Sequence, residues 1–413
     1  MPTIRPFRGI RPSRDLAAEV AAKPYDVLST DEARTEAAGN PLSFLHVGKP
    51  EIDLPPGVDP YTPEVYAKAR ENLDLLLSRG VLFQDPRPSL YVYALTMGAH
   101  QQVGIVGCVS VEEYQNGVIR KHELTRPDKE DDRTRHILAT NAQTGPIFLT
   151  HRAAPAIDAV VAPVIREKPE YDFVASDGVR HRLWVIADDP TVQKLVKLFC
   201  ELPLLYIADG HHRSAAAARA AAERARRNPR HTGMEEYNFF LAVIFPHDQL
   251  QILEYNRLVE DLNGFTRDRF LEMLRRDFDV EKTRGRVRPM RKGEFGLYLE
   301  GSWYTLTAGR EFLEVADPVE RLDVSVLQSR ILAPLLGIED QRRNKRIDFV
   351  GGIRGAGELE TRVNSGEMAA GFTLYPTSID ELLAIADAGR IMPPKSTWFE
   401  PKLRDGLLVH GLE

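Results

Sequence analysis

The sequence predicts a mixed α/β fold, in which helices and strands alternate along the chain. Segments with one apolar helical face alternate with short β-branched runs, which is typical of α/β and α+β proteins. A length of 413 residues suggests two or three domains. Hydrophobic residues make up 43% and charged residues 28% of the chain, as in an ordinary globular protein. We expect a boundary near residue 258, with a second α/β region over residues 259–413.

Helix starts and strand patterns alternate over the first 200 residues. Ser29 and Glu32 are three apart, the spacing of a capping box in which each side chain satisfies the other residue's free backbone donor. Thr62 precedes Pro63 at the start of a helix that Gly80 ends. Apolar or β-branched runs predict strands at residues 89–96, 102–111, 147–150 and 182–187, and a helix is expected at residues 192–201.

The rest of the chain continues the alternation. Strands are expected at residues 204–208, 238–245 and 250–255, and a hairpin at residues 295–299 and 302–307. A helix should carry Phe270, Leu271, Leu274 and Phe278 on one face. Asp323 is expected to cap a helix that carries apolar positions and ends at Gly337: Leu327, Ile331, Leu332 and Leu335. Ser378 and Glu381 have the spacing of a second capping box.

Charge and targeting signals exclude several classes of protein. A net charge of −6 argues against a protein that coats nucleic acid, and the basic run at residues 224–227 is interpreted as the solvated end of a helix. No segment approaches the ~18 apolar residues of a membrane helix, and the first residues lack a signal-peptide core. Cys108 and Cys200 lie in apolar runs and are expected to be buried. We expect a cytoplasmic protein that acts on small molecules and does not bind membranes or nucleic acid; its oligomeric state is not indicated.

The strongest functional signal is the run from Tyr206 to Arg213, Tyr-Ile-Ala-Asp-Gly-His-His-Arg. A buried strand ends at Gly210, and an alanine-rich helix follows directly. The first N–H groups of a helix lack internal partners and carry the positive end of its dipole, which makes an anion site. Gly210 lets phosphate approach the backbone, and Arg213 can form paired hydrogen bonds with phosphate oxygens. His211 and His212 are ~100° apart on a helix, so one of them should face the ligand.

Other interpretations of this run stay open. Asp209 can act as an N-cap with histidines that only pack, or Asp209 and a histidine can bind a metal ion. A second charged segment spans residues 121–136, where Glu123 or Asp132 can serve as a general base or hold Mg²⁺ through water. Lys129 and Arg133 are four residues apart and would share a helix face. The same segment can also form an exposed helix with internal ion pairs.

Two shorter segments, one near each end of the chain, also carry candidate site residues. Asp26 follows Pro24-Tyr25 and is interpreted as a turn residue, with an acid or metal role as the alternative. Lys395 follows two prolines, and a stiff loop can present a lysine to an anion.

Several motifs together resemble a known family, the domain of unknown function 1015. The matching segments run through the chain in one order: Ile4–Gly9, Pro24–Val27, Lys121–Thr125, Lys129–Arg133, Tyr206–Arg213, Leu322–Val324 and Pro393–Lys402. Separately, Asp209–Arg213 resembles the phosphate-binding turn of the ParB and sulfiredoxin superfamily. Within that superfamily, its sequence is most similar to the motif of the free-serine kinases. This second resemblance implies a ParB/sulfiredoxin-like nucleotide-binding core with large insertions at residues 1–258.

The resemblance to free-serine kinases implies a phosphotransferase that uses ATP or ADP with Mg²⁺ and converts free L-serine to O-phosphoserine. Under it, Gly210, His211, His212 and Arg213 hold the donor phosphates, with Lys395 as a further anion contact. Glu123 is the predicted proton acceptor, with Asp26 as the alternative. Asp209 orients a histidine or metal-bound water. The catalytic set is thus Glu123, Asp209 and His211.

Other functions of the same turn stay open. His211 stands where sulfiredoxin has its reactive cysteine, which disfavours that chemistry. The rival functions are a nucleotide-binding regulator without chemistry and a ParB-type nuclease or phosphodiesterase.

Overall fold

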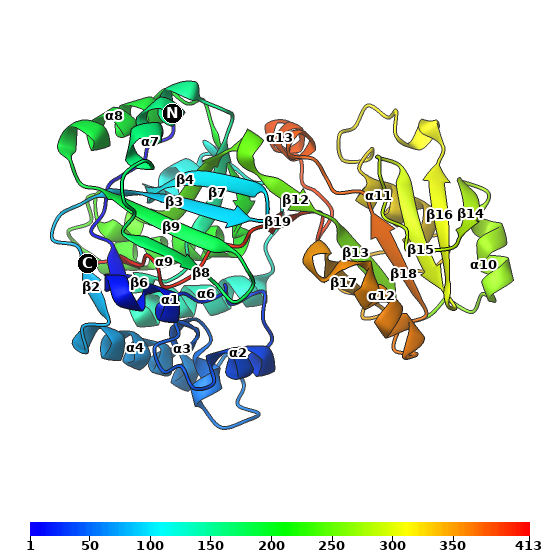
Figure 1. Ribbon diagram of the computed structural model, residues 1–413, viewed down its shortest axis with the longest axis horizontal. Coiled ribbons are helices and arrows are strands. Elements are labelled where there is room, and N and C mark those ends of the chain that lie inside the picture. Colours follow the sequence, from blue (N-terminus) through cyan, green and yellow to red (C-terminus); the bar gives the residue numbers. More distant parts are fainter. The chain divides into compact units, whose positions relative to one another are not determined.

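The computed structural model describes residues 1–413, which form two compact units (Figure 1). Unit 1 comprises residues 1–121, 125–250 and 401–413, and unit 2 comprises residues 122–124 and 251–400. A simple boundary at residue 258 would place residues 401–413 with the second unit, but these residues belong to unit 1. They return to unit 1 because the backbone of Asp405 bonds to Ala22 and that of Val409 bonds to Ile10. No helix in the chain has the length and apolar character needed to cross a bilayer.

Unit 1 is built on one mixed eight-stranded sheet. In spatial order its strands are β5 (Ile119–Arg120), β10 (Leu205–Asp209), β7 (Ile147–His151), β11 (Phe239–Pro246), β4 (His100–Ser110), β3 (Leu90–Met97), β9 (Arg180–Ile186) and β8 (Tyr171–Val174). β5 is parallel to β10 and β7 is parallel to β11, whereas the remaining neighbours are antiparallel. The predicted mixed α/β class is confirmed.

Helices and two small ladders complete unit 1. The helices are α1 (Ala17–Val20), α2 (Thr30–Ala37), α3 (Leu45–Gly48), α4 (Pro63–Ser78), α5 (Val111–Gln115), α6 (Pro127–Thr140), α7 (Pro155–Val164), α8 (Asp189–Cys200) and α9 (His211–Arg227). β1 (Ile10–Pro12) pairs with β2 (Leu82–Gln84), and β6 (Ala142–Gln143) pairs with β20 (His410–Gly411). The capping box of Ser29 and Glu32 is present at the start of α2. Buried residues of the central strands pack with the alanines of α9 in one apolar core.

Unit 2 has an antiparallel six-stranded sheet of its own. Its spatial order is β14 (Phe278–Thr283), β16 (Ser302–Ala308), β15 (Glu294–Leu299), β18 (Ala370–Leu374), β13 (Tyr255–Val259) and β17 (Ile347–Gly351). Its helices are α10 (Arg267–Leu274), α11 (Asp323–Leu327), α12 (Gly355–Asn364) and α13 (Ile379–Asp387). β12 (Gln251–Leu253) pairs with β19 (Trp398–Glu400) where the chain enters and leaves the unit. The predicted hairpin of β15 and β16 and the capping box of Ser378 with Glu381 are both present.

Four local predictions are wrong. Phe278 begins strand β14, because α10 ends at Leu274. Asp323 does not cap α11; its carboxylate oxygens accept from the backbone N–H of Gly293 at 3.0 and 3.1 Å. Cys200 is only half-buried at the end of α8, whereas Cys108 is buried as expected. The single strand expected at residues 250–255 is divided, since β12 and β13 belong to different sheets.

Candidate functional site

Two neighbouring parallel strands place two helix starts at the same edge of the unit 1 sheet. β10 leads through Gly210 into α9, and β5 leads through residues 121–126 into α6. Leu205 lies opposite Ile119 and Tyr206 lies opposite Arg120 in the parallel register. The carboxyl ends of parallel strands are where α/β proteins bind ligands. The register therefore explains why two segments far apart in sequence share one site.

Helices α6 and α9 run side by side in the same direction. At their starts, the backbone N–H of Arg126 donates to Nε2 of His212 at 3.0 Å. Further along, Arg219 pairs with Glu130 at 3.2 Å and with Asp131 at 2.6 Å. Each helix start carries roughly half a positive charge, so two starts together attract an anion more strongly than one.

Gly210 makes the turn between β10 and α9. It is the N-cap of α9, with φ 99° and ψ 30°, a left-handed conformation that favours glycine. A Cβ at this position would stand 3.2 Å from Nε of Arg213, because that side chain folds back along the turn. A bulge in β10 after Ile207 re-aims the backbone just before the turn.

Asp209 does not cap the helix but pairs with a lysine from the C-terminal segment. Nζ of Lys402 lies 2.8 Å from Oδ2 of Asp209, with side chains 14% and 31% exposed. Burial alone would raise the pKa of Asp209, but Lys402 and Arg213 hold that pKa well below its usual range. Asp209 is therefore a fixed anion. Its predicted role as a metal ligand stays a prediction.

Arg213 lies inside a group of carboxylates. Its Nη1 donates to the carbonyl of Pro146 at 2.5 Å. Burial lowers the pKa of the guanidinium, but Asp26, Asp209 and Asp405 more than offset this, so the pKa is raised. The expectation that Arg213 forms paired hydrogen bonds with phosphate is untested. Here the side chain balances nearby negative charges.

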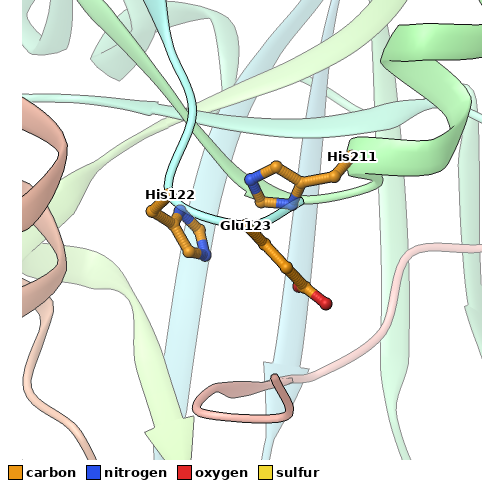
Figure 2. Close-up of side chains that lie close together, drawn as sticks. All are labelled: His122, Glu123 and His211. Carbon is orange, nitrogen blue, oxygen red and sulfur yellow. The ribbon is translucent and has the colours of Figure 1, made fainter. Parts of the chain in front are cut away.

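The two histidines of the turn have different neighbours. Nε2 of His212 accepts from Arg126, so that nitrogen carries no proton and His212 ties α9 to α6. His211 is buried and lies beside His122 and Glu123, which follow β5 (Figure 2). One ligand atom of each of these three residues lies within 4.8 Å of the others. Residues 122–124 group with unit 2 by their contacts, but Lys121 and Thr125 on either side belong to unit 1.

The ligand atoms of His122, Glu123 and His211 can be compared with those that the expected Mg²⁺ would need. Two imidazoles with one carboxylate suit a transition-metal ion, whereas Mg²⁺ prefers oxygen ligands and octahedral geometry. The three residues thus do not fit Mg²⁺ by themselves. Mg²⁺ stays a prediction, and no step of the proposed reaction is routed through it.

The charged residues of α6 divide between structural and exposed roles. Asp132 is buried, accepts from the hydroxyl of Tyr66 at 2.9 Å and pairs with Arg133 at 2.8 Å. The guanidinium of Arg133 stacks on the ring of Tyr25 at 4.0 Å. Lys129 does not share in this pair but donates to the hydroxyl of Tyr61 at 2.7 Å. Asp132 and Arg133 thus form an internal ion pair, but the pair is largely buried and not exposed as that alternative expected.

Asp26 and Lys395 belong to different units. Asp26 is exposed in unit 1, and its negative charge raises the pKa of Arg213. Lys395 is in unit 2 with φ 57°, and its carbonyl accepts from Nη2 of buried Arg257 at 2.9 Å. Its predicted contact with an anion stays a prediction.

Sequence reasoning missed two residues of the site, Lys402 and Asp405. Both lie in the C-terminal segment that returns to unit 1. Asp405 is 5% exposed and lines a cavity of about 30 Å³ with Arg213, Arg133 and Tyr25. Burial raises the pKa of Asp405 to about 7, although Arg213 opposes the shift. Lys402 ends the last of the family motifs, but its spacing gave no reason to bring it to the turn.

Comparison with known proteins identifies the family. A model of the family described as "Protein of unknown function (DUF1015)" matches residues 4–325. The chain belongs to this family. It matches none of the curated proteins.

Among solved structures, the DUF1015 chain is similar to a variant of free serine kinase in complex with AMP. That match has 14% identity and a TM-score of 0.36, over 71% of this chain and 87% of the other. A conserved hypothetical protein from Pyrococcus furiosus has 15% identity and a TM-score of 0.37, over 74% and 95%. SbnI with a C-terminal truncation, from Staphylococcus aureus, has 12% identity and a TM-score of 0.38, over 73% and 86%. These are distant likenesses.

Proposed function

We propose that this protein is a phosphotransferase that moves a phosphoryl group from a nucleotide to a hydroxyl of a small metabolite, with L-serine as the first acceptor to test. One observation carries the proposal. Two parallel helices, α6 and α9, begin at the same edge of the sheet, next to the left-handed glycine turn at Gly210. Phosphoryl transfer needs mainly positioning and charge neutralisation from a protein, which such an arrangement supplies.

The residues of the turn have complementary roles in this proposal. The N–H groups at the start of α9 bind the donor phosphates beside Gly210. His211 lies at the same helix start and contacts the phosphate region. Lys402 carries a second positive charge, which is held near the turn by Asp209.

Glu123 is the proposed proton acceptor. Its carboxylate belongs to the cluster with buried His211 at the start of α9 (Figure 2). The acceptor oxygen attacks the terminal phosphorus, the bond from phosphorus to the leaving nucleotide oxygen breaks, and the hydroxyl proton passes to Glu123. Asp26 is the alternative acceptor, because it is exposed and its charge acts on nearby Arg213.

The experiment is a phosphorus NMR assay of the purified protein. L-serine is incubated with ATP, ADP or pyrophosphate in the presence of divalent ions, and O-phosphoserine is the expected product. Glu123→Gln should slow turnover strongly but keep nucleotide binding, and exposed Glu64→Gln in α4 is the matched control. A folded protein that binds nucleotide but transfers phosphate to no hydroxyl would contradict a kinase. That result would favour a nucleotide-binding regulator.

A further inference from the structure

A charge count around Arg213 leaves one negative charge without a partner in unit 1. Arg133 pairs with Asp132 at 2.8 Å, and Lys402 pairs with Asp209 at 2.8 Å. Arg213 is then left to balance the carboxylates of both Asp26 and Asp405. One guanidinium cannot neutralise two ionised carboxylates, so the group has a surplus negative charge.

Asp405 is a buried carboxylate of this group. It is 5% exposed, and its Oδ1 is buried without a hydrogen bond. Arg213 lines the same cavity of about 30 Å³. Buried polar atoms in native proteins nearly always have partners, so the unpartnered carboxylate oxygen on this cavity indicates a missing hydrogen-bond donor.

The cavity lies next to the phosphate turn. Arg213 lines it with one part of its side chain and reaches back toward Gly210 with another. Gly145 closes the wall beside Asp405: a Cβ there would stand 2.8 Å from Oδ1. The space is therefore shaped by a glycine and is large enough for one or two non-hydrogen atoms of a ligand.

We propose that this cavity binds the ammonium group of the acceptor, with Asp405 as the residue that receives its hydrogen bond. The inference rests on the proposed function, since it names the class of acceptor as an alcohol that carries a primary amine. The ammonium supplies the positive charge that the group lacks. Without it, a proton on Asp405 relieves the surplus, which agrees with the raised pKa produced by burial and Asp26 against the opposing charges of Arg213, Arg133 and Arg404.

The test compares acceptors that differ only in the amine, by calorimetry without nucleotide. The pairs are ethanolamine with ethylene glycol, and L-serine with L-glycerate. We expect each amine to bind at least tenfold more tightly than its partner. We also expect binding at pH 7 to release protons, measured from the enthalpy in two buffers of different ionisation enthalpy.

Substitutions at the cavity show whether Asp405 itself produces the amine preference. Asp405→Asn should remove both the amine preference and the proton release while leaving L-glycerate binding unchanged, and Gly145→Ala should do the same by displacing the carboxylate. Asp172→Asn, at an exposed pair with Arg180, is the control. Equal affinity within each pair, or an amine preference that survives in Asp405→Asn, would overturn the proposal. The same proton release with sodium or potassium chloride alone would assign the cavity to an inorganic cation and also overturn it.

The failure of the proposed function gives a different result. Since the calorimetry contains no nucleotide, amine binding can be intact when no phosphoryl transfer occurs. Amine binding without transfer to any acceptor contradicts the kinase alone. Transfer without amine preference contradicts only the role of Asp405.

Discussion

Replacing Asp405 by asparagine should stabilise the protein at alkaline pH and not at acid pH. Burial raises the pKa of this carboxyl from the ordinary 3.8 to about 7. The folded protein therefore holds a proton that the unfolded chain releases between these two pH values. The contribution of this proton to stability is present below about pH 4 and is lost as the pH rises through about 7.

The size of the effect follows from the two pKa values. Each unit of pKa corresponds to about 1.4 kcal/mol, so the ionised, buried carboxylate costs about 4 kcal/mol of unfolding free energy above pH 7. Asparagine has no charge to bury, but its amide needs hydrogen bonds, and Arg213 loses one of its anionic neighbours. We therefore expect a net gain of about 1–3 kcal/mol at pH 8.

Thermal and urea denaturation at pH 8 and pH 4.5 provide the assay. A gain of this size raises the Tm at pH 8 by roughly 2–4 °C per kcal/mol, and the gain should shrink or vanish at pH 4.5. Asp172→Asn is the control for loss of an exposed carboxylate. A stability difference between Asp405→Asn and the natural protein that is the same at both pH values would refute the argument, because the carboxyl would then not change its protonation between them.

Four further outcomes follow from the turn. Arg213→Gln should weaken nucleotide binding by ~1.5–3 kcal/mol in calorimetry and also lower the Tm, since it leaves neighbouring carboxylates without a counter-charge. Lys402→Met should destabilise the protein by roughly 1–2 kcal/mol at pH 7, because Asp209 stays ionised and half-buried. In urea titrations that deficit should shrink as the pH falls below the ordinary carboxyl range, since Lys402 holds the pKa of Asp209 down. Glu123→Gln should reduce phosphoryl transfer ~10²–10⁴-fold in the NMR assay with nucleotide affinity unchanged. Gly210→Ala should cost about 1–2 kcal/mol from its positive φ, and an unchanged melting curve would show that the turn is not strained.

Local patterns were sufficient for many elements of the fold. The capping boxes at Ser29 and Ser378 depend on residues three apart, so neighbouring sequence decides them. The strand that ends at Gly210 and the helix that follows were predictable for the same reason, since glycine permits the left-handed turn and alanines favour the helix. Errors occurred where distant parts of the chain decide the secondary structure. Phe278, for example, is part of a strand because it pairs with Ala308 of the neighbouring strand β16.

The candidate site divides in the same way. The sequence alone determined the turn that is proposed to bind phosphate, because a strand, a glycine and a helix start are consecutive in the chain. It also pointed to Glu123, but only the parallel register of β5 and β10 explains why that residue lies beside His211. Lys402 and Asp405 come to the turn through backbone pairing of the C-terminal segment with the first strand and helix region. Pairings over hundreds of residues leave no local periodicity in the sequence, so tertiary structure alone decided which lysine balances Asp209 and which carboxylate is buried beside Arg213.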